Sequence, residues 1–214
     1  MIYKNLIIAP HADDEVLGCG NFMLKNKCDV LIMGVSSYVN FKGDYILASD
    51  KIKEIKACHK FLGVGETFIF RGEEGHLDLL PEYEIVTYLD DLLKSNYDRI
   101  FLPYPSRHID HRVTYNAVMA ALRLREGKPQ EKEVYLYEYP FVQTTDALTS
   151  GGVYLPCTLL ELEQKIDAFM FYVTQTKQKP SPLNPDGIKT LAKMRGMEMG
   201  FDYAEKYYLH SYIL

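Results

Sequence analysis

The sequence of 214 residues lacks the signs of a membrane-spanning, secreted or cysteine-dependent protein. No apolar run approaches the length of a membrane span, and the apolar stretch within residues 1–8 is too short for a signal sequence. The four cysteines include no C-x-x-C pair, so we expect them to be small buried side chains without a function. We therefore expect a cytoplasmic protein with no membrane partner.

The sequence also lacks an excess of positive charge and any repeated or low-complexity tract. It has 24 lysines and arginines against 29 aspartates and glutamates, which gives a formal net charge of -5. Nucleic acid is therefore an unfavourable partner, because proteins that bind polyphosphate need a basic surface. The length and the 47% hydrophobic composition suit a single globular domain covering residues 1–214, and they leave a homo-oligomer open.

Short apolar runs alternate with helical patterns along the chain. Four runs have the length and composition of buried strands: residues 6–9, 30–35, 67–70 and 99–102. Between them, apolar residues recur at intervals of three and four, as they do from Ile52 to Leu62 ahead of Gly63. This alternation predicts an α/β protein with a mostly parallel sheet and helices on both faces, arranged in three layers.

Two patterns in the second half of the chain predict further elements. Thr158 is followed three residues later by Glu161, a capping-box signature that opens a helix whose buried face would run from Leu162 to Val173. Tyrosines alternate over residues 134–140, so we expect a strand with the three rings on one face.

The first cluster of reactive side chains, His11-Ala12-Asp13-Asp14-Glu15, follows the first predicted strand directly. Open parallel sheets hold their ligands at the carboxyl ends of strands, so this position suits a functional site. Adjacent carboxylates raise one another's pKa, which makes the cluster costly to fold unless a cation neutralises it. The sequence therefore predicts a metal at this place.

The second cluster, Ser106-Arg107-His108-Ile109-Asp110-His111, follows the fourth predicted strand and opens a helix. His108 and His111 are three residues apart, so both side chains can point into the same space. If the two strands are neighbours, His11, Asp14 and His111 meet as two imidazoles and one carboxylate. Such a ligand set leaves a coordination position for water, as in hydrolytic zinc sites.

The remaining residues of the two clusters suit a hydrolysis. A bound divalent ion lowers the pKa of its water from about 15.7 towards 7 and polarises a carbonyl group. Asp13 is placed to take the proton as general base. A protonated His108 would stabilise the oxyanion, with Asp110 keeping it charged and oriented.

Together the two clusters resemble the hallmark motifs of the LmbE-like or PIG-L family of N-acetylglucosaminyl deacetylases. These motifs are His-Pro-Asp-Asp-Glu after the first strand and His-x-Asp-His after a later one. The resemblance implies a Rossmann-like fold and a hydrolase that removes an acetyl group from an N-acetylated amino sugar or its glycoside. It assigns zinc to His11, Asp14 and His111, and it gives Asp13, His108 and Asp110 the roles described above. The same ligands also accept iron(II) or another divalent ion.

The resemblance extends over most of the chain. Lys51-x-x-Glu54 resembles the Arg-x-x-Glu helix of the family, and Arg195-Gly196 with residues 203–205 resembles its C-terminal signature. An alanine replaces the proline of the first motif, and Lys51 stands where the family often has an arginine that contacts the substrate. We expect Lys51 to contact the substrate with the same charge but without the forked geometry of a guanidinium.

Two other functions are compatible with the same residues. Two histidines and one carboxylate also form the facial triad of non-haem iron(II) enzymes, although those usually have a double-stranded β-helix fold. A non-enzymatic binding module for sugars or nucleotides would need no base beside the metal, so Asp13 and His108 disfavour it. Gly18-Cys19-Gly20 matches a dinucleotide fingerprint weakly, because Met23 stands at the third glycine position.

Several other polar residues are interpreted as structural. A single histidine is more often a hydrogen-bonded structural residue than a ligand, so we expect His59 to be a surface or packing residue. Glu15 is expected to be structural as well. The Glu73-Glu74 pair before Gly75 predicts a solvated turn outside the site.

Overall fold

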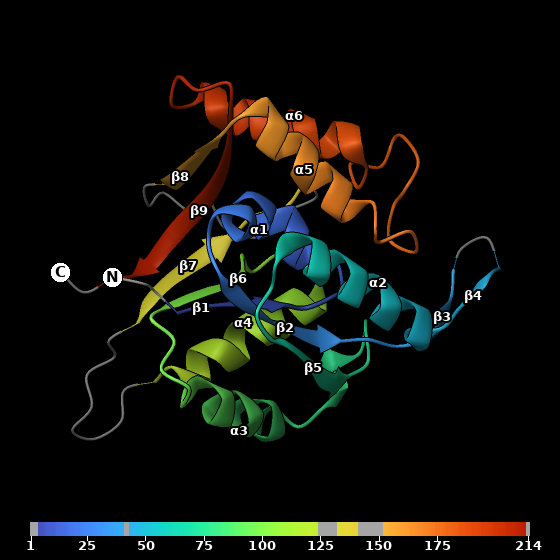
Figure 1. Cartoon of the computed structure of the whole chain (residues 1–214). Helices are drawn as coiled ribbons and strands as arrows, with labels where there is room; N and C mark the ends of the chain where they lie inside the picture. Colours follow the sequence, from blue (N-terminus) through green and yellow to red (C-terminus); the bar gives the residue numbers. More distant parts are fainter. Residues whose placement is uncertain (1–3, 41–42, 124–131, 141–151, 213–214) are drawn as a thin grey trace.

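The computed structural model describes residues 4–40, 43–123, 132–140 and 152–212 (Figure 1). Residues 1–3, on which part of the signal-sequence expectation rests, lie outside them. Within the described residues, seven strands form one sheet in the order β5-β2-β1-β6-β7-β9-β8. The strands are β1 (Asn5–Ala9), β2 (Cys28–Gly34), β5 (Thr67–Gly72), β6 (Arg99–Pro103), β7 (Glu133–Tyr137), β8 (Gly152–Cys157) and β9 (Tyr203–Ser211).

The pairing of these strands makes the sheet mostly parallel. The strands from β5 to β7 pair in parallel, whereas β9 pairs antiparallel with both β7 and β8. A separate short hairpin is formed by β3 (Tyr38–Val39) and β4 (Tyr45–Ile46). The four strands predicted from apolar runs are confirmed, and so is the α/β fold class.

Helices cover both faces of the sheet and complete the three layers (Figure 1). One face carries α1 (Asp14–Lys25), α2 (Ala48–Leu62), α5 (Leu159–Phe169) and α6 (Pro185–Met197), and the other carries α3 (Glu82–Leu93) and α4 (Ile109–Ala121). Successive residues of β1 alternate between the two cores: Ile7 and Ala9 pack on the first face, and Leu6 and Ile8 on the second. A strand buried on both faces must be apolar throughout, which explains the unbroken apolar run.

The helix ends follow the predicted signals with one correction. Gly63 ends α2 in the left-handed conformation at φ 70°, and Thr158 and Glu161 form the predicted capping box of α5. The helix ends at Phe169, however, so the prediction that Val173 belongs to its buried face is wrong. Val173 lies beyond the helix with 73% of its side chain exposed.

The predicted strand of tyrosines is β7, and it ends at Tyr137. The buried ring of Tyr137 donates its hydroxyl to the carbonyl of Ile8 at 3.0 Å. The same ring packs against Gly18 so closely that a Cβ there would collide with it. Close packing against Tyr137 therefore explains the glycine at position 18, so Gly18 gives no support to a dinucleotide site.

The C-terminal signature contributes Glu205, a buried residue of β9 that fixes α1. The helix is kinked at Cys19 (φ -130°), and the backbone amides of Asn21 and Phe22 beyond the kink donate to the Glu205 carboxylate at 2.8 and 3.0 Å. Lys165 of α5 forms an ion pair with the same carboxylate at 2.7 Å. One buried carboxylate thus fixes α1, whose first residues belong to the site.

The arrangement of strands brings the two reactive clusters together. β1 and β6 are parallel neighbours, with Ile7 opposite Phe101. The chain runs from β1 to β2 and β5 on one side and then crosses to β6 on the other, so the loops after β1 and β6 diverge to opposite faces. A crevice forms at such a point of an open sheet, which is where ligands bind. Among the described residues, no helix is long and apolar enough to cross a membrane.

Candidate active site

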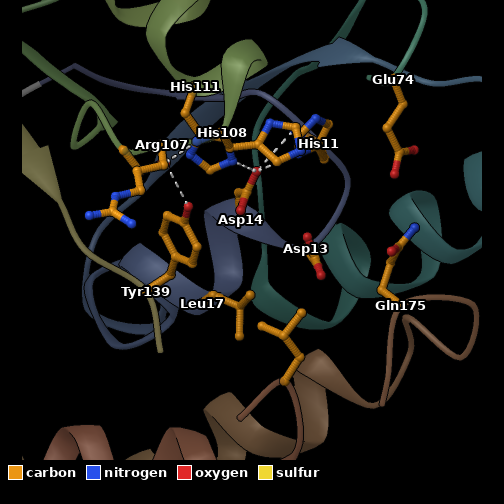
Figure 2. A pocket seen from close by; sticks show the side chains of 12 residues that line it. His11, Asp13, Asp14, Leu17, Glu74, Arg107, His108, His111, Tyr139 and Gln175 are labelled. Carbon is orange, nitrogen blue, oxygen red and sulfur yellow. Dashed lines mark hydrogen bonds and ion pairs between the residues drawn. The ribbon is translucent and has the colours of Figure 1, made fainter. Parts of the chain in front are cut away.

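The side chains of His11, Asp14 and His111 meet at this crevice (Figure 2). Asp14 Oδ2 lies 3.2 Å from His11 Nδ1 and 3.3 Å from His111 Nε2. Two ligands that are bound to one tetrahedral zinc at about 2.0–2.1 Å lie about 3.3 Å apart. The two distances and the chemistry of the donors therefore fit a divalent metal ion held by these three residues.

His108 lies beside this group and is a candidate for a further ligand or a substrate contact. One ring nitrogen from each of His11, His108 and His111 lies within 4.8 Å of the other two. His108 also caps α4, because its Nδ1 accepts the backbone N–H of Asp110 at 3.3 Å. The Nδ1 atom that accepts this bond carries no proton, which leaves Nε2 as the donor.

The carboxylate of Asp110 contacts His11 rather than His108, which differs from the expected pairing. Its Oδ2 lies 2.8 Å from His11 Nε2 and accepts the N–H of Gly75 at 2.5 Å, and its Oδ1 accepts the N–H of Leu77 at 3.1 Å. A carboxylate behind a ligating imidazole fixes the orientation of the ring and strengthens it as a ligand. Asp110 therefore positions His11.

The pKa values of His11 and His108 reflect these contacts. Burial alone would lower the pKa of His11, but its hydrogen bonds to Asp110 and Asp14 raise the pKa to about 10. Burial and the charges of His11 and His111 lower the pKa of His108, which favours its neutral form. The expectation that Asp110 keeps His108 charged therefore finds no support in the geometry.

The carboxylates of Asp13 and Asp14 are adjacent in sequence but differ in acidity. Burial alone would raise the pKa of Asp14, but the charge of His111 and the hydrogen bonds from both imidazoles lower it well below its usual range. Burial and then the charges of Asp14 and Glu15 raise the pKa of Asp13 well above its usual range. Asp14 is thus suited to be a ligand and Asp13 to accept a proton.

The backbone of Asp13 has a conformation that residues other than glycine rarely adopt. Its φ is 120° and its ψ is -29°. The N–H of Asp13 donates to Glu15 Oε2 at 3.1 Å, and its carbonyl accepts the amides of Val16 and Leu17 at 3.1 and 2.9 Å. These bonds over-determine the strained residue, as such conformations require.

Glu15 is itself fixed by a buried network behind the site. Its side chain is fully buried, and its Oε1 accepts the hydroxyl of Tyr172. The same oxygen lies 3.5 Å from Nε2 of His59, whose Nδ1 is 2.7 Å from the hydroxyl of Thr67. The expectation that His59 is a packing residue agrees with its 3% exposure. Glu15 was expected only to be structural, and the sequence did not indicate that its carboxylate accepts the backbone N–H of Asp13.

Lys51 lies behind the site rather than in it. Its side chain is fully buried, it forms an ion pair with Glu74, and its ammonium nitrogen lies 4.5 Å from the centre of the Tyr38 ring. Glu74 lies in a turn, as predicted, but it lines the site pocket, so the expectation that the Glu73-Glu74 pair lies outside the site is wrong for Glu74. Lys51 is not among the described residues that line the site pocket, and its contact with substrate stays a prediction.

The pocket at the site has a volume of about 320 Å³. Beyond the residues above, its walls include side chains to which the sequence analysis gave no role in the site: Leu17, Ser106, Arg107, Tyr139, Gln175 and Leu183 (Figure 2). Ser106 and Arg107 adjoin the second motif, and Tyr139 continues the alternation of the tyrosines, so these three had a signal in the sequence. Leu17, Gln175 and Leu183 had none.

Comparison with known proteins places the chain in a family. Residues 6–122 match the PIG-L family, described as GlcNAc-PI de-N-acetylase. This segment contains both reactive clusters and more than half of the chain. No curated protein sequence matches the chain.

Solved structures share the fold at low sequence identity. N,N'-diacetylchitobiose deacetylase from Pyrococcus horikoshii is 20% identical with a TM-score of 0.74, covering 97% of this chain and 83% of that one. The zinc-inhibited form of teicoplanin deacetylase Orf2 is 17% identical with a TM-score of 0.73, covering 96% and 97%. GalB, a 4-carboxy-2-hydroxymuconate hydratase from Pseudomonas putida KT2440, is 14% identical with a TM-score of 0.70, covering 99% and 98%. These likenesses show the fold.

Proposed function

Because the chain belongs to the PIG-L family of GlcNAc-PI de-N-acetylases, we propose that it is a metal-dependent N-deacetylase acting on an N-acetylated amino sugar, free or within a glycoside or conjugate. The observation that carries this proposal is the position of Asp14 at 3.2 and 3.3 Å from two imidazoles, beside the buried carboxylate of Asp13. The proposal treats residues 1–214 as one deacetylase domain.

His11, Asp14 and His111 would hold the metal, which we take to be zinc, with iron(II) or another divalent ion as the alternatives. When bound, the ion would supply an acidified water and a polarised acetyl carbonyl. The family match and the two deacetylases among the structural neighbours support a deacetylation as the reaction.

Asp13 would act as the general base. Its carboxylate takes one proton from the attacking water as the new C–O bond forms at the acetyl carbon. It then returns that proton to the departing nitrogen as the C–N bond breaks, so the products are acetate and the free amine. A raised pKa suits both steps, because the group must gain and lose a proton near neutral pH.

His108 would stabilise the oxyanion of the tetrahedral intermediate as a hydrogen-bond donor from Nε2. Its Nδ1 is already an acceptor of a backbone N–H, so the neutral ring presents its one proton to the pocket. Asp110 would act through His11 by fixing the orientation of that imidazole. Glu74, Arg107 and Gln175 supply polar groups for the hydroxyls of a sugar.

The test is acetate release from a panel of N-acetylated sugars, free, nucleotide-linked and glycosidic, with zinc and with iron(II) under anaerobic conditions. The matched control is Asp13→Asn, which should retain the metal and lower kcat on the order of 10² to 10⁴. Acetate release by Asp13→Asn at the parent rate would remove Asp13 from the mechanism. The absence of acetate from every sugar would overturn the deacetylase assignment, which matters because a hydratase shares the fold.

A further inference from the structure

A second cavity adjoins the site pocket. Its volume is about 750 Å³, against about 320 Å³ for the site pocket, and Leu183 lines both. One wall is formed by Asn40, Asp44 and Ile46 at the hairpin of β3 and β4, and the other by residues within the segment 173–183 that follows α5. We call this second cavity the 173–183 groove.

Gln175 lies where the site pocket and the 173–183 groove meet. Its side chain faces the site pocket (Figure 2). Thr174 and Thr176, on either side of it, line the groove. Gln175 is 7% exposed, and its amide nitrogen finds no hydrogen-bond partner among the residues that the structure describes. A buried donor without a partner is unfavourable, so this amide is suited to an acceptor supplied by a ligand.

The wall that carries Gln175 is fixed by hydrogen bonds. Thr174 donates both its backbone N–H and its hydroxyl to Glu54 of α2, at 3.1 and 2.6 Å. Further along, the N–H of Lys177 donates to the carbonyl of Leu183 at 2.8 Å. The groove is therefore largely formed before a ligand arrives, which lowers the entropy that binding must overcome.

The lining of the groove suits a neutral, hydroxyl-rich ligand. It carries neutral amide and hydroxyl groups from Asn40, Thr174, Thr176, Gln178 and Ser181, next to the apolar surfaces of Ile46, Val173 and Leu183. Mostly apolar walls with a few hydrogen-bonding groups are usual for small-molecule sites.

The charges at the groove balance one another. Lys179 forms an ion pair with Asp186, and Asp44 accepts the side-chain N–H of Asn40 at 3.1 Å. With Lys177, the groove and its rim hold two ammonium groups and two carboxylates. A phosphate would find no excess of positive charge there, because these opposite charges compensate.

We propose that the 173–183 groove binds a neutral sugar attached to the N-acetylated residue, and that Gln175 donates a hydrogen bond to the substrate at the junction of pocket and groove. The inference rests on the proposed function, because it places the acetylated residue in the site pocket. It makes the preferred substrate a neutral glycoside of at least two units rather than a free monosaccharide or a nucleotide sugar.

The experiment compares kcat/KM for N-acetylglucosamine, N,N'-diacetylchitobiose and a nucleotide-linked N-acetylglucosamine. Two ordinary hydrogen bonds in the groove correspond to at least about a tenfold preference for the disaccharide. Val173→Trp should fill the groove, because Val173 is 73% exposed and lines it, and should lower the ratio of disaccharide to monosaccharide kcat/KM at least about tenfold. Leu160→Trp, at an exposed position of α5 that lines neither cavity, is the matched control and should keep the parent ratio.

Gln175→Leu tests the junction, because leucine is close in size but has no donor. It should lower kcat/KM for the disaccharide by about three- to tenfold, the effect of one hydrogen bond, while the thermal unfolding transition stays cooperative. Two results would refute sugar binding in the groove while leaving the deacetylase function intact. One is equal kcat/KM for monosaccharide and disaccharide in the parent enzyme, and the other is an unchanged ratio in Val173→Trp. A higher kcat/KM for the nucleotide sugar than for the disaccharide would refute the inference that the groove prefers a neutral ligand.

If no sugar releases acetate, binding provides the separate test. Calorimetric titration with N,N'-diacetylchitobiose and with N-acetylglucosamine should then show tighter binding of the disaccharide, lost in Val173→Trp. Equal or undetectable binding of the two sugars would overturn the groove as well.

Discussion

Glu15 is the residue whose replacement tests most directly how the fold holds the general base. Its carboxylate accepts the N–H of Asp13, and the backbone of Asp13 is strained at φ 120°. Glu15→Ala removes this acceptor, so Asp13 can relax to a common conformation that turns its carboxylate away from the reacting atoms. Glu15→Gln keeps one oxygen in the same place and serves as the conservative variant.

The magnitude follows from the strain. A residue in a sparsely populated conformation costs on the order of 1–3 kcal/mol, which the surrounding structure must supply. A hydrogen bond to a charged acceptor is worth about 1.5–3 kcal/mol, so the Glu15 contact alone can offset that cost. Losing it should therefore lower kcat about 10- to 100-fold, since 1.4 kcal/mol corresponds to a factor of ten.

The assay is acetate release at saturating substrate, together with metal content by elemental analysis and thermal unfolding of each variant. We expect Glu15→Ala to retain the metal, because His11, Asp14 and His111 are unchanged, and Glu15→Gln to restore most of the rate. The decisive measurement is a double-mutant cycle with Asp13→Asn. If Glu15 acts through Asp13, its replacement should change the residual rate of Asp13→Asn by less than about threefold. An equal loss of rate in both backgrounds would refute the reasoning.

Three further predictions concern the metal, the pocket wall and the pH dependence of stability. His111→Ala should abolish metal binding, because two remaining ligands hold a divalent ion poorly, and full occupancy by elemental analysis would contradict the ligand assignment. Lys51→Met should lower the free energy of unfolding in urea by about 2 kcal/mol, because Glu74 loses its charged partner. The double variant Lys51→Met with Glu74→Gln should recover part of this loss, and additive effects of the two substitutions would contradict the pairing. Burial alone would raise the pKa of Glu198, but hydrogen bonds from three neighbouring side chains lower this pKa to about 2. The ionised carboxylate therefore stabilises the fold fully above the unfolded pKa near 4.5, and this stabilisation is lost as the pH falls towards 2. Glu198→Gln should therefore flatten the loss of stability between pH 4.5 and 2, and an unchanged acid limb would show that the carboxylate is not coupled to folding.

The sequence predicted the parallel part of the sheet because its signal is local. A strand buried on both faces needs an uninterrupted apolar run, and β1 and β2 are such runs. The antiparallel edge was not predicted, since β8 and β9 are separated by more than forty residues and their pairing depends on long-range contacts. Local periodicity cannot encode which distant strand completes a sheet.

The sequence predicted which residues meet at the candidate site, because each motif is contiguous, but it did not predict the orientation of every side chain. The meeting of His11 with His111 followed from placing both clusters at strand ends. The direction of the Asp110 side chain did not follow, because residues of the first helical turn can point to either side, and its carboxylate points to His11. The sequence did not indicate Gln175, because this residue follows a turn after α5. The first residues of that turn were predicted to continue the helix as far as Val173.

The three bonds of the Asp110 carboxylate have a consequence for how affinity is regulated. One side chain touches the imidazole of His11 and the backbone amides of Gly75 and Leu77, which closely follow the pocket-lining Glu74 in the chain. Loading the ion and ordering the sugar-facing loop should then reinforce each other thermodynamically. By reciprocity, a sugar that tightens the hold on the ion must be bound more weakly, by the same factor, when the ion is stripped away.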